Sequence, residues 1–144
     1  MRKLELETEV IQISIYSDII VCLLKNHRRL SLNKMLFFAY VIKKSQYNLD
    51  NVYTAKNTKD VVYKVISLIS GDFKDYCLNV QFIIKAIHLL ITKNIIVYND
   101  TMISMDDNEK VKTIYKEAPF VEKAIEESKI MSDKQFMREV ISNV

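Results

Sequence analysis

Histidine, cysteine and acidic side chains are the residues of this chain that could transfer protons, attack a substrate or ligate a metal ion. The chain has two histidines, His27 and His88, and neither lies at the Asp-x-His, Cys-x-x-Cys or His-x-x-x-His spacings that bring such groups together locally. The acidic pairs Asp106-Asp107 and Glu126-Glu127 suit solvated faces or helix starts, where carboxylates offset the helix dipole. We therefore expect no catalytic residue, no metal site and no enzyme activity.

Glycine-rich loops that hold phosphate groups are missing from the sequence as well. The 144 residues include one glycine, Gly71, and one proline, Pro119. Phosphate loops and dinucleotide-binding turns need several glycines, because backbone N–H groups must approach the ligand closely. The sequence therefore predicts neither a bound nucleotide nor another cofactor.

Positive charge is concentrated in the first third of the chain. Between Ile19 and Leu49 there are six basic residues and no acid: Lys25, Arg28, Arg29, Lys34, Lys43 and Lys44. Such side chains could contact the phosphates of double-stranded DNA, which adds affinity that does not depend on base sequence. The alternative, which we favour, is that they are solvated helix ends, with Lys43 and Lys44 at the negative end of a helix dipole.

The stretch from Asn79 to Met105 predicts a long amphipathic helix that runs into a β-hairpin. Its apolar residues recur at helical spacing: Val80, Ile83, Ile84, Ile87, Leu90 and Ile91. We expect Ile84 and Ile87 to be buried. Two β-branched runs, 95–98 and 101–105, then flank Asn99-Asp100, which tolerates the positive φ of a hairpin turn. A helix followed by a hairpin is the second half of a winged helix, a fold that binds DNA in some proteins and other proteins in many more.

The charge of this module argues against sequence-specific reading of DNA. The polar face of the predicted helix holds four residues, Gln81, Lys85, His88 and Thr92, and so carries a single cation. The turn of the wing holds Asp100, which would face phosphate oxygens unfavourably. We expect a partner protein to contact Gln81, Lys85 and His88. Phe38 is a further expected contact, because the helical wheel places this aromatic residue on the outer face of its own helix.

Further helices are predicted over 19–25, 31–44 and 58–70, and again after Asp106. Residues suited to helix ends support them: Asp18 and Ser31 as N-caps, Gly71 at a C-terminal end, Pro119 in a first turn, and Ser132 with Gln135 as a capping box. Residues 4–16 fit either a strand or a helix, and 45–57 read as a polar loop.

The predicted fold is mainly α with a small β-hairpin. We expect a winged-helix-like single domain over 1–144, with an N-terminal helical part at 1–45, two helices and a wing at 58–105, and C-terminal helices at 106–144. The longest unbroken apolar run, 35–42, has eight residues, whereas a membrane span needs about 20. Charged residues at 2–7 interrupt any signal-peptide core. These features predict a cytoplasmic protein that does not enter a membrane.

Four passages carry a family resemblance that covers nearly the whole chain. They are Ile15-Tyr16-Ser17-Asp18 with Leu23-Leu24-Lys25, the helix over 30–37, the block from Leu78 through Leu90 with the hairpin at 95–104, and the tail at 110–120 with 136–140. Together they resemble the small middle subunit of ABC-three-component systems, the Lamassu-type antiviral defence modules of bacteria. The shared features are patterns of apolar residues rather than chemical signatures.

This resemblance implies a non-enzymatic bridging subunit. It would sit between an SMC/Rad50-like ABC ATPase with long coiled coils and an effector subunit, often a nuclease. The ATPase would sense foreign DNA, and the small subunit would couple that event to the effector, touching DNA only weakly and without sequence preference. Two alternatives remain open: a small winged-helix transcriptional regulator that binds DNA through the basic 25–44 segment, and a toxin–antitoxin or phage accessory protein.

Overall fold

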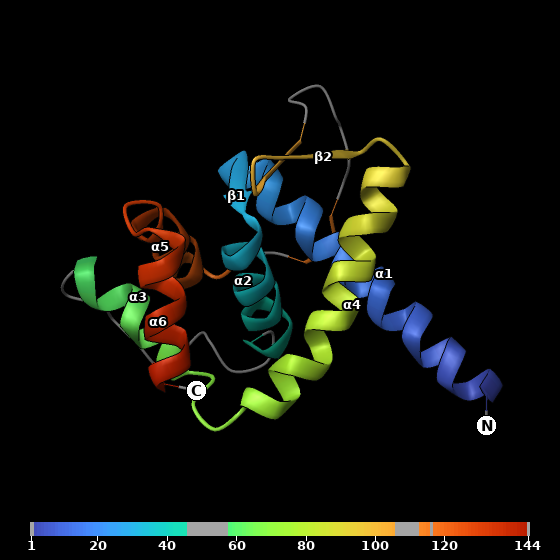
Figure 1. The fold of residues 1–144 in the computed structure, drawn as a ribbon, viewed down its shortest axis with the longest axis horizontal. Coiled ribbons are helices and arrows are strands. Elements are labelled where there is room, and N and C mark those ends of the chain that lie inside the picture. Colours follow the sequence, from blue (N-terminus) through green and yellow to red (C-terminus); the bar gives the residue numbers. More distant parts are fainter. Residues whose placement is uncertain (1, 46–57, 106–112, 116, 144) are drawn as a thin grey trace.

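The computed structural model describes residues 2–45, 58–105, 113–115 and 117–143, which form a mainly helical fold with one small antiparallel sheet (Figure 1). The elements in chain order are α1 (Arg2–His27), β1 (Arg29–Ser31), α2 (Leu32–Ser45), α3 (Thr58–Ser67), α4 (Phe73–Thr92), β2 (Ile96–Asn99), β3 (Met102–Met105), α5 (Pro119–Ser128) and α6 (Asp133–Asn143). The predicted mainly helical class with a small hairpin is confirmed. The expected loop after Ser45 and the expected helix start at 106 lie outside the described residues.

Helix α1 is one continuous helix. It includes residues 4–16, which fitted either a strand or a helix, and the short helix predicted at 19–25. Asp18 lies inside this helix, so its predicted role as an N-cap is wrong. Its carboxylate instead accepts hydrogen bonds from the backbone N–H groups of Ile114, at 3.1 Å, and Tyr115, at 2.9 Å. The helix ends at His27, and Arg28, with φ at 68°, turns the chain into β1.

The sheet has the strand order β1-β3-β2, with both pairings antiparallel. Ile103 of β3 lies opposite Leu30 of β1 and Tyr98 of β2, and both Leu30 and Ile103 are buried. The turn of the hairpin is Asp100-Thr101, with φ at 51° and 62°. It therefore lies one residue later than the predicted Asn99-Asp100, because Asn99 still pairs with Met102.

The predicted signals at the other helix ends agree with the structure. The Ser31 hydroxyl accepts a hydrogen bond from the Lys34 N–H, at 3.3 Å, and the Ser132 hydroxyl accepts one from the Gln135 N–H, at 3.1 Å. Pro119 begins α5, where its missing N–H costs nothing. Gly71, with φ at 86°, has the predicted left-handed conformation, but α3 ends at Ser67, three residues before the predicted end, so Gly71 lies in the turn that follows the helix.

Helix α2 lies in the middle of the molecule, with α1 and α4 on one side and α5 and α6 on the other (Figure 1). The Phe37 ring meets Phe38 and Phe136 of α6 at centroid distances of 5.3 Å each, and Tyr76 of α4 at 6.4 Å. Phe38 is 0% exposed. The prediction of an exposed Phe38 is therefore wrong, because the helical wheel assumed a single buried face and α2 is covered on both sides.

Helix α3 packs against α5 and α6, although it lies between α2 and α4 in the sequence (Figure 1). Its buried side chains include Val61, Val65 and Ile66. The structure therefore groups α3 with the C-terminal helices, whereas the sequence grouped it with α4 and the wing.

The N-terminal half of α1 extends away from the other elements (Figure 1). Four aliphatic side chains on it, Leu4, Leu6, Val10 and Ile11, are 57% to 68% exposed. Charged residues alternate with them, and none of the described helices is long and apolar enough to cross a membrane.

Candidate functional site

The outer face of α4 combines exposed apolar side chains with little free charge. Ile84 is 49% exposed, and Gln81 and His88 lie exposed beside it at helical spacing. The ammonium group of Lys85 pairs with the carboxylate of Glu9 on α1, which offsets its charge. The structure thus brings the three predicted contact residues of this helix, Gln81, Lys85 and His88, onto one exposed face.

The exposure of Ile84 corrects the predicted phase of α4. Its inner stripe is formed by Ile83, Ile87 and Leu90, which are buried, so the prediction for Ile87 is confirmed and the prediction for Ile84 is wrong. The predicted apolar stripe covers a wider sector of the helix surface than the neighbouring elements bury, and Ile84 lies outside the buried sector. Phe38 is not part of this face, because it lies in the core.

The wing adds exposed apolar side chains and no cation. Strand β2 is an edge strand that contacts α4, and its Val97 and Tyr98 are exposed. The tip of the hairpin presents Asn99 and Asp100. A wing of this kind offers phosphate oxygens no charged donor.

Two of the six predicted DNA-contacting residues, Lys34 and Lys43, hold the fold together instead. Lys34 is buried, and its ammonium group donates a hydrogen bond to the carbonyl of Met131 at 2.7 Å. Burial lowers the pKa of Lys34 from its ordinary value. The ammonium group of Lys43 donates to Gln12 and, at 3.2 Å, to Asn79.

The remaining basic residues are exposed. Lys44 is paired with two carboxylates, Asp72 at 3.4 Å and Asp75 at 3.3 Å. Lys25, Arg28 and Arg29 lie at the end of α1 and the start of β1. Besides Lys44, the predicted basic cluster therefore contributes three exposed residues at one corner of the molecule rather than a continuous surface.

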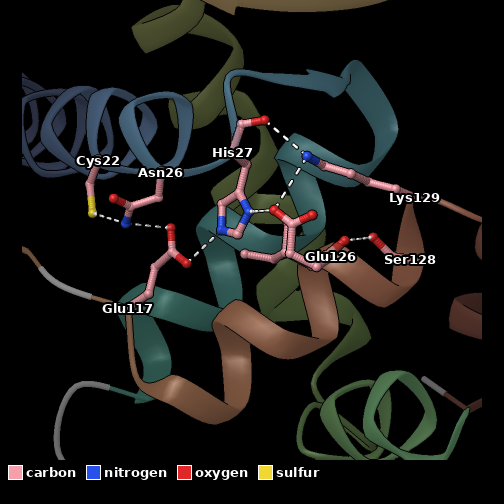
Figure 2. Close-up of polar contacts among 8 residues, drawn as sticks. Cys22, Asn26, His27, Glu117, Glu126, Ser128 and Lys129 are labelled. Atoms are coloured by element: carbon pink, nitrogen blue, oxygen red, sulfur yellow. Dashed lines mark hydrogen bonds and ion pairs between the residues drawn. The ribbon is translucent and has the colours of Figure 1, made fainter. Parts of the chain in front are cut away.

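A partly buried ionic cluster surrounds His27 at the C-terminal end of α1 (Figure 2). The ring Nε2 lies 2.6 Å from Glu117 Oε2, and Nδ1 lies 2.6 Å from Glu126 Oε1. The side chains of His27 and Glu117 are each 1% exposed. Burial acts against a charged ring, but the hydrogen bonds to Glu117 and Glu126 outweigh it and raise the pKa of His27 above 6.5.

Further hydrogen bonds extend this cluster across three segments (Figure 2). The Asn26 amide donates to Glu117 at 3.1 Å. The Lys129 ammonium donates to the backbone carbonyl of His27 at 2.9 Å and lies 3.3 Å from Glu126. The cluster therefore joins the end of α1 to α5 and to the residues just before it.

Sequence reasoning missed this cluster because Glu117 is 90 residues from His27 and Glu126 is 99 residues away. One signal was available. Leu23 and Leu24 lie one helical turn before His27 and mark its side of the helix as apolar, and a buried imidazole needs hydrogen-bond partners. That signal predicts the existence of partners, but it does not say which acids they are.

The geometry assigns the His27 cluster a structural role. Both ring nitrogens face carboxylate oxygens, so neither is directed at a space where a substrate could react. Within the described part of the chain, no three histidine, cysteine or acidic side chains are arranged to hold a metal ion. What the cluster can do is hold α1 and α5 together.

Comparison with known proteins found no match to a protein family, to a curated protein or to a solved structure. Function must therefore be inferred from the contacts, exposure and charge of this chain's own residues.

Proposed function

We propose that this chain is a non-catalytic, winged-helix protein-docking subunit that links a coiled-coil ABC ATPase to an effector protein in a bacterial defence complex. The chain order α1-β1-α2-α4-β2-β3 and the sheet order β1-β3-β2 support the winged-helix assignment. The strand after the first helix pairs with the last strand of the hairpin, and α4 directly precedes the wing. Helix α3 is then an insertion into this module.

The observation that carries the proposal is the exposed face of α4, the helix that would enter a DNA groove in a DNA-binding winged helix. Ile84 is 49% exposed there, and Lys85 is already paired with Glu9. A helix that reads DNA needs free cations near the phosphates. A half-exposed isoleucine on a face with little free charge is instead typical of the apolar centre of a protein interface.

The projecting half of α1 supports a helical partner. Leu4 and Ile11, seven residues apart, share one face of this helix, and Leu6 and Val10, four residues apart, share the opposite face, so each pair is a small exposed apolar contact point for a partner helix. An amphipathic helix of the ATPase that packs against α1 would bury these side chains. The family resemblance is the source of the ATPase and effector assignments, whereas the docking faces come from the residues of this chain.

Co-expression with the ATPase encoded by a neighbouring gene tests the proposal. The complex should survive gel filtration in ~0.3 M salt, where weak phosphate contacts are lost. Ile84→Glu should disrupt it, because the new carboxylate would be buried at the interface. Ile141→Glu is the matched control, since Ile141 is 66% exposed on α6 and its variant should bind like wild type. Persistence of the complex with Ile84→Glu would contradict docking through α4.

A DNA-binding regulator is the second candidate, favoured by the three exposed basic residues Lys25, Arg28 and Arg29. The docking proposal predicts weak DNA binding that is equal for unrelated sequences, and no hydrolysis of ATP or DNA by the purified chain with or without magnesium. Tight, sequence-selective DNA binding by the purified chain, lost in Arg28→Ala and Arg29→Ala, would contradict the docking proposal and support a DNA-binding regulator.

A further inference from the structure

A pocket of about 520 Å³ opens between β1, the start of α2 and the turn that joins α5 to α6. Leu30, Met102 and Met131 supply apolar parts of its lining. Its volume falls in the range of small-molecule sites, which are commonly about 300–1,000 Å³. The pocket does not include the outer face of α4.

Positive charge exceeds negative charge along the pocket lining. Arg29, Lys34 and Lys129 line it, against a single carboxylate, Asp133. Lys129 is paired with Glu126, which is not part of the lining, so the excess rests on Arg29 and Lys34. Asp133 accepts a hydrogen bond from the Ser31 hydroxyl at 2.6 Å, so part of its accepting capacity is already used. The pocket therefore favours an anion.

Lys34 is the central residue of this charge excess. Its side chain is 8% exposed, and its ammonium group donates to the carbonyl of Met131 at 2.7 Å. Asp133 lies 4.0 Å away, which is beyond hydrogen-bond distance. An ammonium group has three N–H donors, and a buried cation is stabilised by each further acceptor that it reaches. An oxyanion in the pocket would supply such acceptors.

We propose that this pocket binds a small organic anion, with a carboxylate or phosphate head at Lys34 and Arg29 and an apolar body against Leu30, Met102 and Met131. Arginine and lysine donors suit the oxygens of both head groups. The site is separate from the docking face of α4, and its occupation is independent of whether that face binds an ATPase.

Titration of the full, ¹⁵N-labelled chain with four probes at constant ionic strength tests the site: hexanoate, hexyl phosphate, inorganic phosphate and uncharged 1-hexanol. Hexanoate or hexyl phosphate should shift the amide signals of the lining residues in a saturable manner, and whichever head group binds more tightly identifies the ligand class. Hexanol and inorganic phosphate should each bind at least about tenfold more weakly, because each lacks one half of the recognition.

Neighbouring arginines provide a matched pair of variants. Arg29→Glu should weaken binding of the preferred probe by about tenfold or more, because a charge-assisted hydrogen bond is replaced by repulsion. Arg28→Glu should leave binding within about twofold, since Arg28 is exposed but is not part of the lining. The proposal is overturned if no probe gives a saturable shift up to ~10 mM, if hexanol binds as well as hexanoate and hexyl phosphate, or if the two arginine variants behave alike.

Discussion

His27 is a buried imidazole between two carboxylates, so its contribution to stability depends on pH. Its pKa in the folded chain is raised above the ordinary 6.5, because the hydrogen bonds to Glu117 and Glu126 outweigh the effect of burial. The folded state therefore binds the proton more tightly than the unfolded state does. This stabilisation is fully present below pH 6.5 and is lost as pH rises through the folded-state pKa.

Replacing His27 by glutamine should remove this pH dependence. The free energy of unfolding of the wild type should fall as pH rises above 6.5, and the His27→Gln variant should lack that decrease. Urea unfolding between about pH 6 and pH 9 measures both curves. His88→Gln, at the exposed histidine of α4, is the control and should follow the wild type. A decrease of equal size in the His27→Gln variant would show that another group is responsible.

Phe38 should behave as a core residue in any stability measurement. Phe38→Ala should lower the free energy of unfolding by about 3–5 kcal/mol, because it removes a ring that packs against Phe37 and Phe136 and leaves a cavity. Phe73→Ala is the matched control, since Phe73 is exposed on α4, and it should change stability by about 0.5 kcal/mol or less. Wild-type stability in Phe38→Ala would mean that α2 is open on the side facing α6.

The hairpin turn between β2 and β3 contains one residue whose backbone conformation is unfavourable. Thr101 is β-branched and adopts φ at 62°, where glycine has no steric cost. Thr101→Gly should therefore raise the free energy of unfolding by about 1 kcal/mol, measured by urea unfolding. The same change at Thr92, in helical backbone, should instead lower it by about 0.3 kcal/mol, the difference in helix propensity between threonine and glycine. Destabilisation by Thr101→Gly would show that contacts of its side chain outweigh the backbone strain.

Helix starts were predictable from the sequence where the residues that determine them are only a few positions apart. Ser31, Pro119 and Ser132 mark helix starts through local hydrogen bonds or a fixed φ, and all three are used as expected. The first half of α1 was not predictable, because a helix that is exposed nearly all round shows no apolar period. The polar residues of α4 predict its exposed face. The burial of Ile84 is predicted wrongly, because the spacing of apolar residues does not show how much of the helix surface the neighbouring elements cover.

Contacts between distant segments could not be read from the sequence in the same way. The burial of Phe38 depends on Phe136, and the His27 cluster depends on acids in and just before α5. Nothing local distinguishes these partners from other aromatic or acidic residues. The pocket around Lys34 has the same origin, because the residues of the α5–α6 turn that face β1 are far away in the sequence: Met131 is 97 residues from Lys34, and Asp133 is 102 residues from Ser31.

Whole-molecule stability should depend on the C-terminal helices and hardly at all on the start of α1. Deleting 119–144 removes α5 and α6, which uncovers α3 and one side of α2 and leaves His27 without Glu126. This variant should lose its cooperative unfolding transition. Deleting 2–8 removes only exposed residues and should preserve the transition with a similar midpoint. Circular dichroism during heating and urea titration compares the two, and a cooperative transition in the 119–144 deletion would contradict the packing described for α3.

The placement of α3 has a consequence for synthesis of the chain on the ribosome. Its apolar face, with Val61, Val65 and Ile66, packs against helices that are translated last. At about 5–20 residues per second, that face waits several seconds before α5 and α6 emerge. During this interval the apolar face of α3 lacks its covering helices, and exposed apolar surface of this kind is prone to aggregate. Slow codons between α3 and α5 would lengthen the exposure, so the yield of folded protein should depend on translation speed even when the amino-acid sequence is unchanged.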